Sequence, residues 1–492
     1  MSTIATTGHT VMNNLHDHDS EYSAYSRRQL LQWSGLGFGA LALNVIDAHA
    51  TQSRAEGQNH AFPSIQPKMP HLTPRAKSII FLMQTGGVSQ MDVLDPKPEL
   101  NKYDGQQHEI HLEVSSPGNE ANRILGSWMK FHKRGQCGME ISEALPNIAG
   151  LADDLCLVRS MHTYHNNHLE GWMILSTGKI FQGRPSFGSW ISYGLGTDND
   201  SLPAFAVLRD PAGYNPGPYM WAAGWLPPLY GGTEFYAEGT PILNLRSAKD
   251  QVPGVQRNNL AYLETLNRLH QQNHPNDVRL ETRMVNYELA ARMQVNAMKI
   301  SGTADEPAYI HKLYGLDNLQ TRPYGLRCLM ARKLVESGVR FVSVFPQEEH
   351  TWDSHQNFND ALPMAGATDL PAAGLVRDLK ARGLLDETIV VWAGEFGRLP
   401  ISQGSKGRDH NRNAASCLIA GGGFKPGYIH GETDSLGYKA VENRVSVSDL
   451  HATLLHQLGL DHDKLIYKHS GRDETLTDSP VTGATVVREI LA

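Results

Sequence analysis

Short apolar runs recur along the chain, and each is followed by glycine or a polar loop. The first run, at 77–83, is closed by Gly86 and Gly87, which is the pattern of a buried strand entering a tight turn. Four further runs of this kind lie at 155–159, 204–208, 340–345 and 388–392. The last two follow helix-like stretches at 326–337 and 371–381 that end before glycine. This order predicts parallel βα units, and hence an α/β fold with a mostly parallel central sheet and helices on both faces.

One long helical stretch interrupts this alternation. Residues 258–300 are rich in Leu, Ala, Met, Glu and Arg at helical spacing, which predicts a helical insertion near 258–300. A final helix is predicted at 447–458, before Gly459. We therefore expect one domain over 76–492, preceded by a polar, proline-bearing linker at 51–75.

Residues 1–50 have the layout of an export signal. Arg27 and Arg28 precede an apolar, glycine-rich run at 33–45, and Ala48 and Ala50 supply small residues two apart. Paired arginines before a modestly hydrophobic run are typical of a twin-arginine (Tat) signal, which predicts a periplasmic or extracellular protein. The alternatives are a cytoplasmic amphipathic start and an uncleaved anchor, although a run of 13 residues is too short to span a bilayer.

Charge and composition narrow the classes of partner. The 492 residues carry 44 Lys and Arg against 51 Asp and Glu, a formal net charge of −7, so no basic field favours nucleic acid. Four cysteines are too few for a disulfide framework, and no run after residue 50 is long and apolar enough to span a membrane. The oligomeric state stays open. The 23 histidines stand out, and their positions matter more than their number.

Polar clusters follow the predicted strands, which is where ligands of open α/β sheets bind. Asp92 comes after the first strand, and three histidines ending at His168, with Asn167 beside it, come after the second. Imidazoles and carboxylates are ligands of zinc, manganese and iron. A turn with a solvated carboxylate is the alternative for Asp92, and a hydrogen-bonding role is the alternative for each histidine.

The third cluster contains His350, Asp353 and His355 and comes after the run at 340–345. Two histidines and a carboxylate within six residues predict a group of metal ligands, with a charged surface loop as the alternative. No competing motif is present, because the sequence has no G-x-S-x-G, H-E-x-x-H or P-loop pattern.

The fourth cluster follows the run at 388–392. Glu395 is placed for a ligand or a general base, Asp409 and His410 follow it, and Arg398 or Arg408 would suit an anionic group. A structural Arg408–Asp409 pair and a turn or cap at His410 are the alternatives. Because the carboxyl ends of parallel strands meet at one edge, all four clusters are expected to converge there.

An ordered set of motifs is similar to that of one bacterial family. The motifs are Gly86-Gly87-Val88-Ser89-Gln90-Met91-Asp92, Arg159-Ser160-Met161, Asn167-His168, Trp352-Asp353-Ser354-His355, Gly394-Glu395-Phe396-Gly397-Arg398 and Gly407-Arg408-Asp409-His410-Asn411. On these motifs residues 75–492 resemble the family called domain of unknown function 1501, in which a Tat-type signal is usual. That family is grouped with the alkaline phosphatase and sulfatase superfamily. The resemblance implies the fold of that superfamily and one or two divalent metal ions.

Carried over position by position, the resemblance is partial at the reacting centre. Thr85 or Gln84 stands where the superfamily has its first Asp, so Asp92 would substitute for it. No hydroxyl or thiol stands at 166–168, where the superfamily has its nucleophile, so the resemblance does not extend to a covalent intermediate.

The metal-ligand positions agree better. His350, Asp353 and His355 match the middle ligand group of the superfamily, and His410 matches its last histidine. Glu395-Phe396 replaces an Asp-His pair, which removes one imidazole.

The resemblance implies an exported, metal-dependent hydrolase of sulfate or phosphate esters, with an anionic substrate such as a sulfated or phosphorylated glycan. The divalent metal, Zn, Mn or Ca, would be held by Asp92, His350, Asp353, His355, Glu395, Asp409 and His410. His168 and Asn167 would take part in catalysis, His168 as acid/base or as a further ligand, and Arg408 or Arg398 would bind the anionic oxygens. A degenerate member that binds a ligand or glycan without turnover is the alternative, and a mutase or transferase would share the same site.

Overall fold

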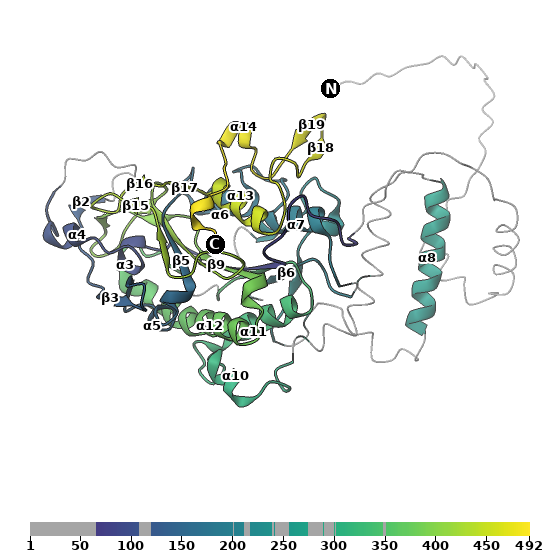
Figure 1. Ribbon diagram of the computed structural model, residues 1–492, viewed down its shortest axis with the longest axis horizontal. Coiled ribbons are helices and arrows are strands. Elements are labelled where there is room, and N and C mark those ends of the chain that lie inside the picture. Colours follow the sequence, from purple (N-terminus) through teal and green to yellow (C-terminus); the bar gives the residue numbers. More distant parts are fainter. Residues whose placement is uncertain are drawn as a thin grey trace, which may run out of the picture. The chain divides into compact units, whose positions relative to one another are not determined.

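A nine-stranded sheet forms the centre of the part of the chain that the structure describes (Figure 1). The structure is a computed structural model, and it describes residues 65–107, 120–199, 201–210, 217–238, 241, 255–273, 289, 300, 302–347 and 351–492. The main path of the sheet is β14-β5-β13-β9-β1-β8-β6-β7, with β17 beside β5. Its strands are β1 (Ser78–Met83), β5 (Leu155–His162), β6 (Phe205–Leu208), β7 (Thr233–Phe235), β8 (Phe341–Val344), β9 (Thr388–Ala393), β13 (Ala415–Ala420), β14 (Tyr428–His430) and β17 (Val445–Ser446).

The strand directions make the sheet mostly parallel, as predicted. β1 pairs in parallel with β8 and β9, and β6 pairs in parallel with β7 and β8. β13 is antiparallel to both β9 and β5, so β5 runs in the same direction as β9. The carboxyl ends of β5, β9, β1 and β8 therefore lie at one edge of the sheet. An apolar run predicts a strand but not the direction in which the strand runs. The antiparallel direction of β13 therefore has no signal in the sequence.

Helices cover both faces of the sheet, which confirms the predicted fold class (Figure 1). α5 (Pro146–Ala149), α11 (Arg322–Glu336) and α12 (Leu362–Ala381) lie on one face. α6 (His168–Thr177), α7 (Phe187–Leu195) and α13 (Val447–Gln457) lie on the other. The predicted helix at 447–458 is thus α13, and its start is stabilised by a capping box.

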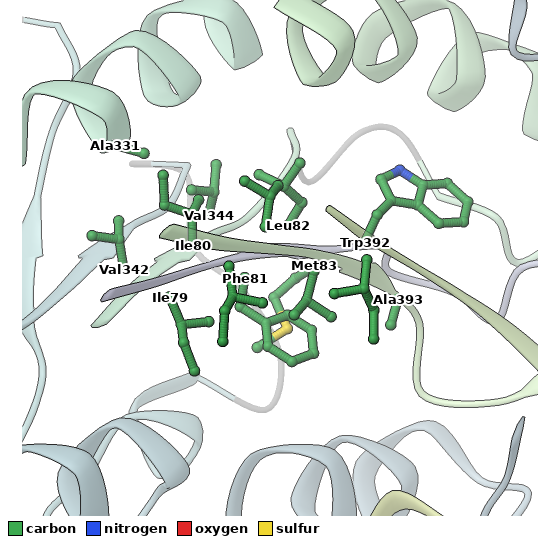
Figure 2. Packing of buried hydrophobic residues seen from close by; sticks show 14 of the residues in the cluster. Ile79, Ile80, Phe81, Leu82, Met83, Ala331, Val342, Val344, Trp392 and Ala393 are labelled. Carbon is green, nitrogen blue, oxygen red and sulfur yellow. The ribbon is translucent and has the colours of Figure 1, made fainter. Parts of the chain in front are cut away.

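β1 shows why its sequence reads as an uninterrupted apolar run. Every residue of β1 is buried, because both faces of this central strand meet helices. In Figure 2, Ile80 and Leu82 point to the side of Ala331 on α11, and Phe81 and Met83 point to the opposite side. The core therefore continues through the sheet from one helical layer to the other.

The described residues contain further helices and strands. The helices are α3 (Gln90–Val93), α4 (Pro98–Lys102), α8 (Val255–Asn273), α10 (Ala308–Leu313) and α14 (Ser479–Thr482). The strands are β2 (Glu120–Ile124), β3 (Phe131–Arg134), β4 (Met139–Ser142), β10 (Gly397–Arg398), β11 (Ile401–Gln403), β12 (His410–Asn411), β15 (Glu432–Thr433), β16 (Ala440–Glu442), β18 (Tyr467–His469) and β19 (Arg472–Glu474). α8 begins just before the stretch at 258–300 that was expected to be helical and overlaps its first part. Within the described ranges, no helix is long and apolar enough to cross a membrane.

The stretch before β1 is held on the domain where a free linker was expected. The backbone amides of Lys68 and Leu72 donate to the carbonyls of Leu195 and Gly459 at 2.9 and 2.8 Å. Residues 65–75 therefore belong to the folded unit, while the signal at 1–50 and the rest of the expected linker lie outside the described residues.

Candidate metal and ester-binding site

Side chains from three of the predicted clusters meet at the carboxyl edge of the sheet. His168 follows β5, Asp353 and His355 follow β8, and Glu395 follows β9. His410 reaches the same edge because β12 pairs with β10, directly after Glu395. Asp353, His168, His355 and His410 are called the Asp353 cluster below. The expected convergence is therefore found for these residues.

Asp353 lies at the centre of this cluster. Its Oδ1 is 2.8 Å from His355 Nε2 and 3.2 Å from His410 Nε2. Its Oδ2 is 3.3 Å from His168 Nε2. The Nε2 atoms of His355 and His410 are themselves 3.1 Å apart. The carboxylate of Asp353 thus contacts three imidazoles that come from three separate segments of the chain.

The outer nitrogens of two of these imidazoles are held by hydrogen-bond acceptors. His410 Nδ1 donates to the carbonyl oxygen of Asn166 at 2.8 Å, and His355 Nδ1 donates to Gln403 Oε1. With Nδ1 carrying the hydrogen, each Nε2 presents a lone pair towards Asp353. Metal-binding histidines are fixed in this way, by an acceptor on the nitrogen that does not bind the metal.

The resulting donor set fits a divalent cation. Donors about 2.0–2.2 Å from a tetrahedral zinc ion stand roughly 3.3 Å from one another. Asp353 Oδ1 and the Nε2 atoms of His355 and His410 are 2.8–3.2 Å apart, so three donors already face a common point. Two overlapping groups have ligand atoms within 4.8 Å of one another, namely His168, Asp353 and His410, and His355, Asp409 and His410.

Arg398 fixes the orientation of the Asp353 carboxylate. Its Nη2 donates to Asp353 Oδ1 at 2.7 Å, and its Nε donates to the carbonyl of Gly87 at 2.9 Å. Nη1 donates to the carbonyl of Arg408, and Nη2 also donates to the carbonyl of Gly86. The side chain is only 2% exposed, so Arg398 holds Asp353 in place in this structure, and its role in binding a substrate anion stays a prediction.

His168 stands at the first turn of α6. The side chain of Asn167, the N-cap of α6, accepts a hydrogen bond from the Leu169 amide and fixes the start of the helix. The His168 Nδ1 lies 2.6 Å from Glu395 Oε1, and its ring packs on Phe396 with 5.0 Å between ring centroids. Its side chain is 32% exposed, so His168 is held firmly and still reaches solvent.

Glu395 serves His168 rather than the inner donor set. Its Oε1 accepts from the Gly86 amide at 3.0 Å as well as from His168, and it belongs to neither group of convergent ligand atoms. Glycine at 171 lets α6 approach closely, because a Cβ there would lie 3.0 Å from Phe396 and 3.2 Å from Glu395, which is tighter than most Cβ contacts. The structure places Glu395 as a partner of His168, and its predicted role as a metal ligand stays a prediction.

The cluster separates the pKa values of its members. Burial alone would raise the pKa of Asp353, but its bonds to the three histidines and the charge of Arg398 hold that pKa well below its usual range. Burial would lower the pKa of His168, but Asp353 and Glu395 outweigh it and raise the pKa to about 9. Hydrogen bonding to Asp353 raises the pKa of His355, whereas burial lowers that of His410.

Asp92 and Arg408 pair with each other and not with the cluster. Arg408 donates from Nε to Asp92 Oδ2 at 2.7 Å and from Nη2 to Asp92 Oδ1 at 3.1 Å. Ser89 donates a further bond to Oδ2, and both charged side chains are almost fully buried. The pair occupies both oxygens of Asp92 and the fork of Arg408. The predicted metal role of Asp92 and the predicted anion-binding role of Arg408 stay predictions.

The remaining predicted residues fall in three places. Asp409 lies 4.0 Å from His355 Nδ1 and accepts the His410 amide at 2.8 Å, at the margin of the cluster. Asn167 is the exposed N-cap of α6, beside His168. His350 lies outside the described residues, so its predicted ligand role stays a prediction.

Three contacts that orient the side chains of the site could not be predicted from the sequence. The carbonyl of Asn166, the side chain of Gln403 and the guanidinium of Arg398 orient His410, His355 and Asp353 respectively. A backbone carbonyl has no sequence signature, and Gln403 lies in a short edge strand with no notable pattern. Arg398 was in a predicted cluster, but its direction into the protein could not be derived from spacing.

A comparison with known protein families finds one match, which covers most of the chain. A family model described as "Protein of unknown function (DUF1501)" matches residues 76–491. No curated protein sequence matches the chain.

Similar solved structures share little sequence with the chain. A sulfatase from a Pseudoalteromonas species is 14% identical, with 78% of this chain and 68% of that chain covered and a TM-score of 0.33. The lipoteichoic acid synthase LtaP of Listeria monocytogenes is 9% identical, with 88% and 80% covered and a TM-score of 0.36. A protein in the alkaline phosphatase superfamily from Vibrio parahaemolyticus is 11% identical, with 85% and 74% covered and a TM-score of 0.33. On the match of its family model, the chain belongs to the DUF1501 family of proteins of unknown function.

Proposed function

We propose that the chain is a metal-dependent hydrolase of a sulfate or phosphate ester. The observation that carries the proposal is the convergence of Asp353 Oδ1 with the Nε2 atoms of His355 and His410. These three residues would hold the cation. Two imidazoles and one carboxylate favour zinc or manganese over calcium, which prefers oxygen ligands alone. When bound, a divalent cation supplies Lewis-acid stabilisation of the negative charge on the ester group.

His168 is the proposed proton donor to the leaving oxygen. Asp353 and Glu395 raise its pKa to about 9, so the imidazole carries a proton at neutral pH. Its partial exposure at the start of α6 leaves it accessible to a substrate. Water adds to the sulfur or phosphorus, the bond to the ester oxygen breaks, and His168 gives that oxygen its proton. The proton that the attacking water loses restores the protonated form of His168.

The residues at the start of α6 favour direct attack of water on the ester over attack by an enzyme side chain. Positions 166–168 hold Asn166, Asn167 and His168, so no serine, threonine or cysteine is placed there to form an ester with the enzyme. The free amide of the exposed Asn167 and the N-terminal end of α6 would orient the anionic oxygens.

Metal content and hydrolysis, measured on the same preparations, test the proposal. Purified wild type should contain a stoichiometric transition metal and should hydrolyse an aryl sulfate or an aryl phosphate. His355→Ala should lose both properties. His132→Ala removes an exposed histidine on β3 and should keep both. Equal metal content and equal activity in wild type and His355→Ala would remove the cluster from the mechanism.

A second candidate is a member of the family that binds an anionic glycan without turning it over. It is favoured by the burial of Arg398 and Arg408, the two arginines expected to bind the ester, in bonds to Asp353 and Asp92. This candidate predicts full folding and sulfated-glycan binding, with no hydrolysis of either aryl ester even after loading with zinc or manganese.

A further inference from the structure

A small cavity lies behind Glu395, on the α6 and α13 side of the sheet. Residues from β5, α6, β9, β13 and α13 contribute to its lining, and it is about large enough for one water molecule. Most of the lining is apolar, including Met161, Leu175 and Val447. We call this space the Glu395 cavity.

Three residues of the lining each have a buried polar atom that has no hydrogen-bond partner among the described residues. These atoms are Oε2 of Glu395, Oγ1 of Thr163 and Oγ of Ser416. The three residues are 1%, 7% and 5% exposed, so bulk solvent does not satisfy them. A buried carboxylate oxygen without a donor is costly, and a cavity with several such atoms is the usual place for an internal water.

We propose that one water molecule occupies the Glu395 cavity, bridges Glu395 to Thr163 and Ser416, and so makes these residues the positioning apparatus of His168. This inference rests on the proposed function and deepens it. The other oxygen of Glu395 is already held by the Gly86 amide and by His168 Nδ1. With a water on Oε2, both oxygens are fixed and the carboxylate plane does not rotate.

The fixed carboxylate determines how His168 faces the cluster. Glu395 Oε1 accepts the Nδ1 hydrogen, which directs Nε2 towards Asp353 and the proposed ester site. The hydroxyls of Thr163 and Ser416 make no hydrogen bond to the Asp353 cluster, so they act through the water and Glu395. The polar side chains of this mostly apolar lining are those of Glu395, Thr163, Ser416 and His162, and the space matches one water molecule.

Crystals of the full chain test the water directly, whether or not any ester is hydrolysed. In wild type we expect one peak within hydrogen-bond distance of all three oxygens, without anomalous signal. Thr163→Ser keeps the hydroxyl and should keep the peak. Thr163→Val keeps the shape, loses the hydroxyl and should lose the peak or displace it. A dry cavity, or a cation in wild type, would overturn the inference.

Kinetics of the zinc- or manganese-loaded protein test the positioning role. We expect Thr163→Val to lower kcat about tenfold with KM and metal content unchanged, and Thr163→Ser to restore it. Ser416→Ala should act like Thr163→Val, and it serves as the second variant if the valine protein does not fold. Equal kcat in the serine and valine variants, with the water lost from one of them, would also overturn the inference. If wild type hydrolyses neither ester, the proposed function fails while the crystallographic result still decides on the water.

Discussion

The Nε2 atoms of His355 and His410 lie 3.1 Å apart, and both face Asp353 Oδ1. Because Gln403 and the Asn166 carbonyl hold the two Nδ1 hydrogens, these Nε2 atoms would place two lone pairs and a carboxylate oxygen against one another. A proton relieves this repulsion at one nitrogen only, as the raised pKa of His355 indicates. A cation relieves it for all three donors.

Zinc or manganese should therefore stabilise the folded protein. At a free metal concentration a hundredfold above Kd, the free energy of unfolding rises by about 2.7 kcal/mol, measurable as a higher Tm. His410→Ala removes one donor and should abolish the increase, whereas His132→Ala should not. An equal rise in Tm in His410→Ala would show that the metal binds elsewhere.

Arg408→Met should destabilise the fold and leave the metal site intact. The substitution leaves Asp92 as a buried carboxylate without its counter-charge, which costs about 3–5 kcal/mol in the free energy of unfolding. Denaturant unfolding measures the loss, and metal content should stay stoichiometric. Lys102→Met, which breaks the exposed pair with Glu99, should change the midpoint little. Loss of ester hydrolysis in Arg408→Met without loss of stability would instead support an anion-binding role for Arg408.

His451 should make the domain less stable in mild acid. It is fully buried, its Nε2 donates to the Leu175 carbonyl at 2.9 Å, and burial lowers its pKa to about 4. The unfolded chain, with a pKa near 6.5, binds the proton first, so stability is complete above that value and falls between about pH 6.5 and 4. The loss between pH 7.5 and 5 should be about 2 kcal/mol.

Denaturant unfolding at the two pH values measures this loss. His451→Gln keeps a donor for Leu175 but does not titrate, so its stability should depend less on pH by that amount. A pH dependence identical to that of wild type would assign the acid sensitivity to other groups.

We propose export through the Tat system, and the two arginines of the signal test it. Replacing Arg27 and Arg28 together by lysine should leave the unprocessed chain in the cytoplasm, as judged by fractionation. Arg472→Lys, the same exchange on the exposed surface of β19, should not alter export. Export in a host that lacks the Tat translocase would contradict the proposal.

Sequence patterns predicted the fold because the burial of side chains repeats regularly along each strand and helix. The run that became β1 is apolar at consecutive positions because helices cover both of its faces. The rule that parallel strands share a carboxyl edge then placed His168, Asp353 and Glu395 together, although they are far apart in the chain.

Pairing of individual side chains could not be predicted in the same way. Asp92 follows β1 and was therefore expected at the carboxyl edge of the sheet with the other clusters. Its carboxylate instead pairs with Arg408, 316 positions away in the sequence. Glu395 stands in the expected place and binds His168, because α6 approaches it closely at Gly171. Such choices depend on side-chain directions and on backbone acceptors, which leave no pattern in the sequence.

Gly86→Ala should disable the metal site without altering any donor. Gly86 has φ of 100°, and a Cβ there would lie 2.1 Å from Thr351 Oγ1 and 2.4 Å from the amide nitrogen of Asp353. Relief of that clash moves the segment that carries Asp353, so metal affinity should fall at least about tenfold, as it does when supporting groups of metal sites are lost. Calorimetric titration with zinc measures the affinity.

Gly105→Ala is the matched control for this substitution. Its φ is 75°, so alanine carries the same left-handed penalty of about 1–2 kcal/mol, but no atom lies within 4 Å of the added Cβ. Gly105→Ala should therefore lose stability and keep wild-type zinc affinity. If both variants lose stability equally and both bind zinc like wild type, the segment at 351–353 tolerates displacement, and Asp353 is not a ligand whose position the fold must maintain.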